Sequence, residues 1–316
     1  MNLSELTTLQ LGGPIGDLRT CTSEADVLAA VEPGVVVLGG GSNVVAPDEG
    51  LDAVALLRND ALFLYGTTVR AAAGTTWDDL VAATLGEGLT GLEAMSGIPG
   101  TVGAAPIQNI GAYGAEVATF VEALRVLDRA TNEVVEIPAA DCGFGYRTSR
   151  FKREPDRWVV LEVHLELRSS DQPVRYAELA KSLGVEVGET APPGEVRQAV
   201  LALRRGKGMV IDPTDPDSVS AGSFFTNPLV EKAPDGAPSW PDTSGLTKVS
   251  AAWLIEHSGF PKGWGDGRIG LSTKHTLAVV NRGGGTTSEL RDVMRTIQTG
   301  VRERFGIRLE NEPVFL

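Results

Sequence analysis

The segment Gly91–Glu116, GLEAMSGIPGTVGAAPIQNIGAYGAE, combines six glycines and two prolines with an almost uncharged apolar run. Glycine loses backbone entropy in a regular element and proline removes a hydrogen-bond donor, so neither a helix nor a strand is expected here. We predict a set of tight buried turns whose backbone N–H groups approach a ligand closely, because no Cβ stands in the way. A phosphate-bearing cofactor is the natural ligand, and a packed loop without a ligand is the alternative.

A second glycine-rich turn, Gly39–Asn43 (GGGSN), directly follows the apolar run Val35–Leu38. Successive N–H groups in such a turn can form a concavity that binds anions. The turn matches neither the GxGxxG dinucleotide fingerprint nor the GxxxxGK[ST] P-loop. Taken alone, it is equally consistent with a phosphate cradle and with an ordinary turn.

Aromatic and cationic side chains are interleaved over Phe144–Lys152. Arg147, Arg150 and Lys152 could clamp a phosphate or a carboxylate, which arginine binds through two parallel hydrogen bonds. The alternative is a basic turn that faces solvent.

The stretch Ser220–Pro228, SAGSFFTNP, presents the hydroxyl of Ser223 in a turn of small residues beside two phenylalanines. It lacks the GxSxG form of a nucleophile elbow. The three histidines, His164, His257 and His275, are scattered, so no His–Asp pair can be proposed to activate the serine. We therefore expect Ser223 to donate a proton if it acts in catalysis, and a capped turn is the alternative.

Near the C-terminal end of the sequence, Glu312 follows the helix stop Phe305-Gly306. Carboxylates in such positions are usually solvated, so the residue taken alone favours a surface role.

Composition limits the class of protein. A chain of 316 residues exceeds what one core usually fills, so two or three units are expected. The net charge of −13, from 28 basic and 41 acidic residues, argues against a nucleic-acid partner. An acidic protein can still bind a small anionic ligand, but the binding must come from local groups, either backbone N–H groups or a few well-placed Lys and Arg side chains.

No apolar stretch of membrane-spanning length is free of Pro, Gly and charge, and no signal peptide is evident, so we expect no membrane insertion and a cytoplasmic location. Cys21 and Cys142 have no CxxC or Cys/His spacing, so neither a disulfide framework nor a metal site is expected.

Hydrophobic periodicity and breakers indicate the elements that must position these residues. A Pro/Asp-rich stretch at 212–218 places the main domain boundary near residue 206. Strands are expected at 34–38, 53–57, 62–65, 69–73 and 158–167, a hairpin at 122–128 and 133–137, and helices at 23–31, 76–85, 195–205, 249–257 and 288–305.

Together these stretches resemble the UDP-N-acetylenolpyruvoylglucosamine reductase (MurB) family, and the resemblance runs through nearly the whole chain. It is carried by LGGGSN (38–43), GIPGTVGAAPIQNIGAYG (97–114), YRTSRFK (146–152), SAGSFFTNP (220–228), AAWLIEHSGF (251–260) and FGIRLENE (305–312).

The resemblance implies an α+β fold. An FAD-binding domain of the vanillyl-alcohol-oxidase (PCMH) type is expected at 1–205, with subdomains at about 1–66 and 67–205, and an α+β substrate domain at 206–316. FAD should be non-covalent, since no histidine lies in the glycine segments. The implied reaction is the NADPH-dependent reduction of UDP-N-acetylglucosamine enolpyruvate to UDP-N-acetylmuramate in peptidoglycan precursor synthesis. We expect the protein to be a monomer.

The resemblance also implies roles for single residues. Arg147 matches the arginine that binds and polarises the substrate carboxylate, Glu312 the active-site glutamate, and Ser223 the serine that protonates C2 after a hydride reaches C3. Arg147 and a protonated Glu312 would stabilise the charge that develops at C2. FAD contacts are expected from Gly39, Gly40, Gly41, Ser42, Asn43, Gly97, Ile98, Pro99, Gly100, Thr101, Gly103, Ala104, Ile110, Gly111 and Gly114, and substrate contacts from Tyr146, Tyr176, Lys207 and Asn227.

Two alternatives remain open at this point. One is another FAD oxidoreductase of the same fold, such as a sugar or alcohol oxidase, against which SAGSFFTNP and FGIRLENE argue. The other is a non-catalytic flavin- or nucleotide-binding protein, which has no need to keep Arg147, Ser223 and Glu312 together. Fold alone does not decide between them.

Overall fold

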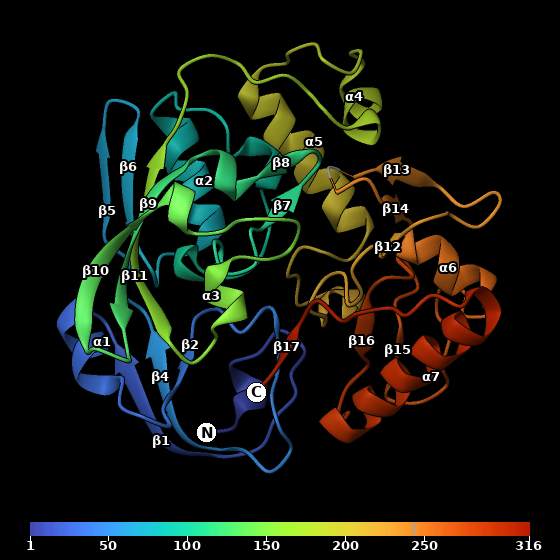
Figure 1. Ribbon diagram of the computed structural model, residues 1–316, viewed down its shortest axis with the longest axis horizontal. Helices are drawn as coiled ribbons and strands as arrows, with labels where there is room; N and C mark the ends of the chain where they lie inside the picture. Colours follow the sequence, from blue (N-terminus) through green and yellow to red (C-terminus); the bar gives the residue numbers. More distant parts are fainter. Residues whose placement is uncertain (243) are drawn as a thin grey trace. The chain divides into compact units, whose positions relative to one another are not determined.

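The computed structural model describes residues 1–242 and 244–316, which form two compact units (Figure 1). Unit 2 consists of Gly16–Gly40 and Asp52–Arg205, and unit 1 of Met1–Ile15, Gly41–Leu51 and Gly206–Leu316. Unit 1 therefore draws two of its segments from the N-terminal part of the chain. The division of functions between residues 1–205 and 206–316 stays a prediction.

Unit 2 is built on two sheets. The smaller has the strand order β1-β4-β2, and the larger is antiparallel with the order β10-β9-β11-β6-β5. The strands are β1 (Ile15–Cys21), β2 (Val36–Leu38), β4 (Leu51–Leu57), β5 (Leu62–Tyr65), β6 (Thr68–Ala72), β9 (Val121–Asp128), β10 (Glu133–Pro138) and β11 (Trp158–Glu166), with a small hairpin of β7 (Gly111–Ala112) and β8 (Ala115–Glu116). The helices are α1 (Glu24–Ala30), α2 (Trp77–Gly86), α3 (Arg150–Arg153), α4 (Ala177–Leu183) and α5 (Pro193–Gly206).

Both faces of the larger sheet are buried, which explains the nearly continuous apolar sequences of β9 and β11. Side chains of a strand alternate between its faces. Leu124 and Val163 join one core with α2, whereas Leu127 and Leu161 join a second core with α1 and β4. Leu161 and Val163 lie only two residues apart, and they reach different faces because the pairing of β11 with β9 is irregular between Val160 and Glu162. The glycine segment supplies apolar side chains to the first core, including Val102. Its apolar residues are thus core residues, and its glycines form the turns between them.

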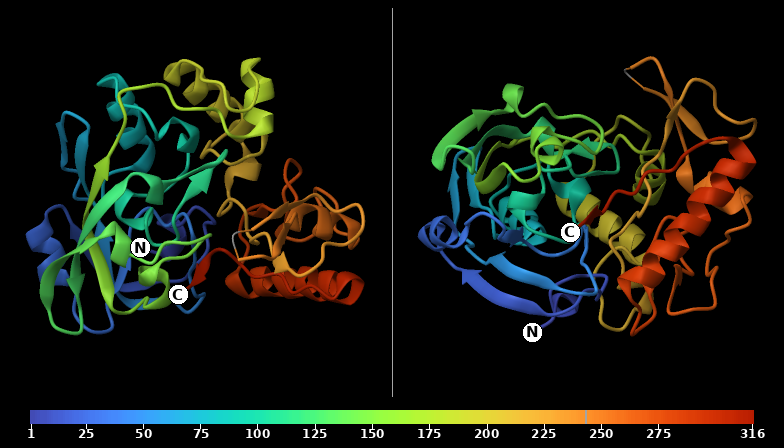
Figure 2. Two further views of the ribbon diagram at one scale, coloured as in Figure 1. Left: turned by 45° about the horizontal axis from the view of Figure 1, so that its top comes forward. Right: turned by 60° about the horizontal axis from the view of Figure 1, so that its bottom comes forward.

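Unit 1 contains the other strands and α-helices of the described residues. They are β3 (Val44–Val45), β12 (Leu229–Val230), β13 (Ser239–Pro241), β14 (Thr247–Val249), β15 (Ile269–Leu271), β16 (Val279–Asn281), β17 (Val314–Phe315), α6 (Ala251–His257) and α7 (Thr287–Phe305). Strand β17 pairs in parallel with β3, and β15 pairs with β16. Figure 2 shows α7, in red, beside the orange segments of the same unit.

Helix α7 has well-defined ends. Thr286 and Glu289 form a capping box at its start, and Gly306 ends it in the left-handed conformation with φ +70°. Both carboxylate oxygens of Asp48 accept backbone N–H groups of its first turn, from Thr287 at 2.7 Å and from Ser288 at 2.9 Å. The segment Gly41–Leu51 is thereby fixed to the helix.

The predicted helices and strands are confirmed, with ends that differ by one or two residues. Helix α5 begins at Pro193, before the expected residue 195. Val249 belongs to β14, so α6 begins only at Ala251. In the parts that the structure describes, no helix is both long and apolar enough to cross a membrane.

Candidate active site

The two predicted cofactor turns of unit 2 are in direct contact. A Cβ on Gly40 would lie 2.7 Å from the Cα of Gly100, and a Cβ on Gly39 would lie 2.3 Å from Oγ1 of Thr101. Only glycine permits so close an approach of two backbones. The turn after β2 and the turn before Val102 therefore form one cradle, although they are far apart in the sequence.

Backbone hydrogen bonds hold the second of these turns against the segment before α2. The N–H of Trp77 donates to the carbonyl of Gly100 at 3.0 Å, and the N–H of Val102 donates to the carbonyl of Thr75 at 2.8 Å. Gly97 and Gly100 have φ values of +69° and +119°, which L side chains rarely adopt. The glycines at these two positions are thus required by the backbone itself.

The residues of this cradle fit a phosphate group. Thr101 is only 6% exposed, and its hydroxyl has no hydrogen-bond partner among the described residues. Leaving such a group unpaired costs about 1–3 kcal/mol, so a ligand acceptor at this place would stabilise it. Together with backbone N–H groups that no Cβ covers, the hydroxyl fits the diphosphate of FAD.

The rest of the first glycine turn belongs to unit 1. A Cβ on Gly41, at φ +61°, would lie 2.0 Å from the carbonyl oxygen of Leu6, so this glycine is needed for packing. Asn43 donates through Nδ2 to the carbonyl of Glu312 at 3.5 Å, and its own carbonyl accepts the N–H of Val314 at 3.0 Å. The turn is thus linked to a segment 269 residues away in the sequence.

Two of the three predicted catalytic residues, Ser223 and Glu312, lie on adjoining segments of unit 1. The N–H of Glu312 donates to the carbonyl of Phe224 at 2.8 Å, and the N–H of Thr226 donates to the carbonyl of Glu310 at 3.0 Å. Phe224, next to Ser223, is fully buried and anchors its segment in the core. Ser223 and Glu312 are both half-buried. Glu312 is therefore not the fully solvated carboxylate that its position in the sequence alone favours.

Arg147, in unit 2, is fixed to the glycine segment. It has a left-handed φ of +51°, and its guanidinium donates to the carbonyls of Asn109 at 3.3 Å and Gly111 at 2.8 Å. Asn109 and Tyr113 also have positive φ values, +48° and +49°. Non-glycine residues in this region are strained, and such strain is common at functional sites.

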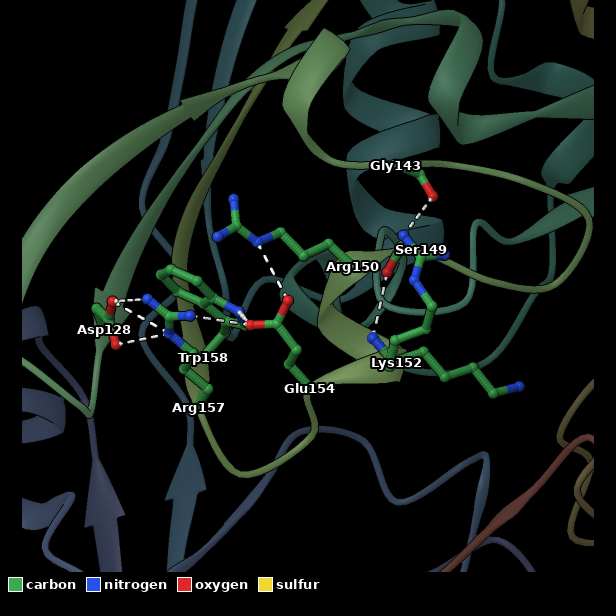
Figure 3. Close-up of polar contacts among 9 residues, drawn as sticks. Asp128, Gly143, Ser149, Arg150, Lys152, Glu154, Arg157 and Trp158 are labelled. Carbon is green, nitrogen blue, oxygen red and sulfur yellow. Dashed lines mark hydrogen bonds and ion pairs between the residues drawn. The ribbon is translucent and has the colours of Figure 1, made fainter.

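Arg150 lies in a different environment from Arg147, although both belong to the same basic run. It is the first residue of α3, which Ser149 caps, and it pairs with Glu154 at 3.5 Å (Figure 3). The guanidinium groups of Arg150 and Arg157 lie 4.6 and 4.4 Å from the ring centre of Trp158. These contacts with Glu154 and Trp158 give Arg150 a structural role.

The predicted substrate residue Tyr176 packs edge-on against Tyr113, with ring centres 5.6 Å apart. Tyr113 lies in the turn between β7 and β8, and burial raises its pKa to about 12, so it stays protonated. Gly114 allows this arrangement, since a Cβ there would lie 2.8 Å from the Cβ of Arg175. Tyr113 was not among the predicted site residues, although its position in GAYG, between two such glycines, was a usable signal.

Two of the other predicted substrate residues lie in unit 1, whereas Tyr146, next to Arg147, lies in unit 2. Lys207 directly follows α5, and the next residue, Gly208, packs with φ +67° against Asp217. Asn227 accepts the N–H of Ala251 through Oδ1 at 2.9 Å, so it also fixes the start of α6.

A cavity of about 140 Å³ in unit 2 lies beside this tyrosine pair, lined among others by Glu93, Tyr113, Gly114 and Arg175. It is too small for FAD, because cofactor sites usually measure about 300–1,000 Å³. Glu93 is buried there, its pKa is raised by burial, and it accepts the N–H of Gly91 at 2.5 Å.

Comparison with known families defines the class of protein. The family model "FAD binding domain" matches residues 18–138, which contain the cradle. The model "UDP-N-acetylenolpyruvoylglucosamine reductase, C-terminal domain" matches residues 213–316, which contain Ser223 and Glu312. The chain is thus an FAD-binding protein with the C-terminal domain of a reductase.

Whole-chain relatives identify the family. The chain is 48% identical to the UDP-N-acetylenolpyruvoylglucosamine reductase of Streptomyces avermitilis, covering 99% of this chain and 93% of the relative. It is 47% identical to that of Thermobifida fusca, covering 99% and 96%. The crystal structure of the Thermus caldophilus reductase (MurB) matches with a TM-score of 0.72 and 28% identity over 100% of this chain and 98% of that chain.

The chain belongs to the UDP-N-acetylenolpyruvoylglucosamine reductase family. The predicted family, the α+β fold with its FAD-binding domain, and FAD as the cofactor are thereby confirmed. The roles of the single site residues stay predictions.

Proposed function

We propose that the protein reduces the enolpyruvyl group of UDP-N-acetylglucosamine enolpyruvate, giving UDP-N-acetylmuramate for peptidoglycan synthesis, with NADPH as the reductant. Membership of the reductase family supports this function, and the match at 213–316 argues against a sugar or alcohol oxidase. The structural observation that carries the proposal is the hydrogen-bonded contact between the segments of Ser223 and Glu312. The expected cytoplasmic location, monomeric state and non-covalent attachment of FAD stay predictions.

The chemistry assigns a task to each of the three residues. Bound FAD, once reduced by NADPH, would supply a hydride to C3 of the enolpyruvyl group, and this addition would leave negative charge at C2 and over the carboxylate. Arg147 and a protonated Glu312 stabilise that charge as it develops, and this lowers the barrier because these interactions are stronger in the transition state than in the ground state. Ser223 then donates its proton to C2, which completes the saturated lactyl ether.

A spectroscopic experiment tests this function. The purified protein should have the visible spectrum of a flavin, which anaerobic NADPH should bleach. Addition of the enolpyruvyl substrate should then restore the oxidised spectrum, with formation of UDP-N-acetylmuramate. A colourless protein, or a reduced flavin that the substrate does not reoxidise, would contradict the proposal.

Replacement of Thr101 by valine should weaken FAD binding about tenfold, because one hydrogen bond to a charged group is lost. The free energy of unfolding of the FAD-free protein should stay the same or rise, since a methyl group replaces a buried hydroxyl that has no partner. Titration of the FAD-free protein with FAD, followed by flavin fluorescence, measures the Kd. An unchanged Kd would place the diphosphate elsewhere.

Replacement of Arg147 by alanine should slow reoxidation of the reduced flavin by the substrate about 10–100-fold, the effect of losing one charge-assisted pair. Flavin content and reduction by NADPH should be kept. Lysine at this position should restore only part of the loss, because it cannot bind a carboxylate through two parallel bonds. The matched control is Arg150→Ala, which should have normal kinetics; loss of FAD from the Arg147 variant, with normal turnover of the remaining holoenzyme, would refute the assignment.

A further inference from the structure

The carboxylate of Asp78 connects three elements of unit 2. Asp78 lies in the first turn of α2, and its Oδ1 accepts the backbone N–H of Gly97 at 2.6 Å. The guanidinium of Arg197, on α5, donates to Oδ1 at 2.7 Å and to Oδ2 at 2.8 Å. One side chain thus holds the start of a glycine turn and is itself held by a helix from a distant part of the chain.

This turn leads directly into the cradle. Gly97 begins the sequence Gly97–Thr101 with φ +69°, in the left-handed region, and the carboxylate of Asp78 accepts its N–H. The other end of the turn is held by the N–H of Trp77, which donates to the carbonyl of Gly100. Two neighbouring residues of α2 therefore hold the turn: Asp78 holds Gly97 through its side chain, and Trp77 holds Gly100 through its backbone N–H.

The electrostatics of Asp78 favour a firm contact. Burial by itself would raise the pKa of Asp78, but hydrogen bonds from Arg197 and from the N–H of Gly97 outweigh it and hold the pKa below its ordinary value. The carboxylate is therefore ionised at neutral pH, and charge-assisted hydrogen bonds are about twice as strong as neutral ones. The side chains of Asp78 and Arg197 are 32% and 18% exposed, so water replaces these bonds poorly.

We propose that Asp78 is a positioning residue for FAD: it fixes the N–H of Gly97 and so holds the turn Gly97–Thr101 in the form that binds the cofactor, while Arg197 keeps its carboxylate in place. The inference rests on the proposed placement of FAD at the cradle of Gly39, Gly40, Gly100 and Thr101. Asp78 acts through the turn and need not touch the cofactor.

A second ion pair of unit 2 offers a matched control. Asp128 accepts hydrogen bonds from Arg157 through both of its oxygens, at 2.8–3.2 Å, and also accepts the N–H of Ala130 at 2.9 Å. It therefore makes the same kinds of bonds as Asp78. They lie at the turn between β9 and β10, however, and hold no residue of the cradle.

The experiment compares FAD affinity with stability in the same variants. FAD-free Asp78→Ala is titrated with FAD, and its thermal unfolding is measured without the cofactor. The Kd should rise about tenfold, because a charge-assisted bond to the turn is lost. Arg197→Ala should act in the same direction, and the double variant should bind FAD no more weakly than the worse single one. Asp128→Ala should lower the thermal stability but leave the Kd unchanged.

Conservative variants separate positioning from mere stabilisation. Asp78→Asn keeps an oxygen that can accept the N–H of Gly97, so its Kd should lie between those of the wild type and Asp78→Ala. These variants also decide the question if Asp78→Ala fails to fold: Asp78→Asn and Arg197→Lys should then show a smaller rise in Kd at native stability. A wild-type Kd in the folded Asp78 and Arg197 variants would overturn the proposal.

Thr101→Val distinguishes this failure from a failure of the FAD placement. If Thr101→Val weakens FAD binding and Asp78→Ala does not, the cradle binds FAD and only the positioning role is wrong. If neither variant changes the Kd, FAD lies elsewhere and both proposals fail.

Discussion

Replacement of Ser223 by alanine is expected to slow reoxidation of the reduced flavin by the enolpyruvyl substrate by ~10²–10⁴-fold or more, the range typical of general acid–base catalysis. The substitution removes one hydroxyl from a half-buried residue whose segment is anchored by Phe224 and Phe225. Folding, FAD binding and reduction by NADPH should therefore be kept. Anaerobic stopped-flow mixing of the reduced enzyme with the substrate measures the rate directly.

Two further variants test the chemical basis of this effect. Ser223→Cys should recover part of the rate, because a thiol can also donate a proton. Ser220, in the same motif, accepts the N–H of Gly222 at 3.2 Å, so Ser220→Ala removes a bond of the turn without removing the proposed donor. Its rate should stay close to that of the wild type. If Ser223→Ala reoxidises normally, the serine only belongs to the turn, and the donor must be another group such as Glu312.

Replacement of Gly40 by valine should yield protein without bound flavin, and hence without reductase activity. The new Cβ would lie 2.7 Å from the Cα of Gly100, a contact that real structures do not tolerate. One of the two backbones must therefore move, and the cradle opens. The ratio of visible flavin absorbance to protein absorbance after purification measures the loss.

The control for this variant is the same substitution at Gly86, in the last turn of α2. Apart from its chain neighbours and the backbone of its own helix, no described atom lies within 4 Å of a Cβ at that position, so Gly86→Val should keep its flavin. Thermal unfolding of FAD-free Gly40→Val shows whether the loss is local to the cradle. A folded Gly40→Val protein with full flavin content would refute the placement of FAD at these turns.

Local structure was largely predictable because short-range signals determine it. Asn132, at φ +59°, closes the turn between β9 and β10 after a recognisable apolar strand. Thr286 and Gly306 mark the two ends of α7 by the capping rules. In each of these places, residue type and backbone conformation agree.

The assembly of the site was not predictable from such signals. The contact of Gly40 with Gly100 and that of Glu312 with Phe224 join segments that have no local relation. Only the family resemblance linked Ser223 with Glu312 before the structure was known. Arg147 and Arg150 belong to the same basic run, but Arg147 donates to the carbonyl of Gly111 whereas Arg150 begins α3. No local signal in the sequence distinguishes these two environments.

The pairing of β3 with β17 has a consequence for the order in which the molecule is made. Strand β3 is translated before its partner β17, and all the residues between Val45 and Val314 are translated in the interval. Closing so long a loop costs entropy that local contacts do not offset. Unit 2 ends at Arg205, so all of its sequence is translated before β17. The segment that carries Glu312 is thus translated after the turns at Gly39–Asn43 and Gly97–Thr101, which are the proposed FAD-binding turns.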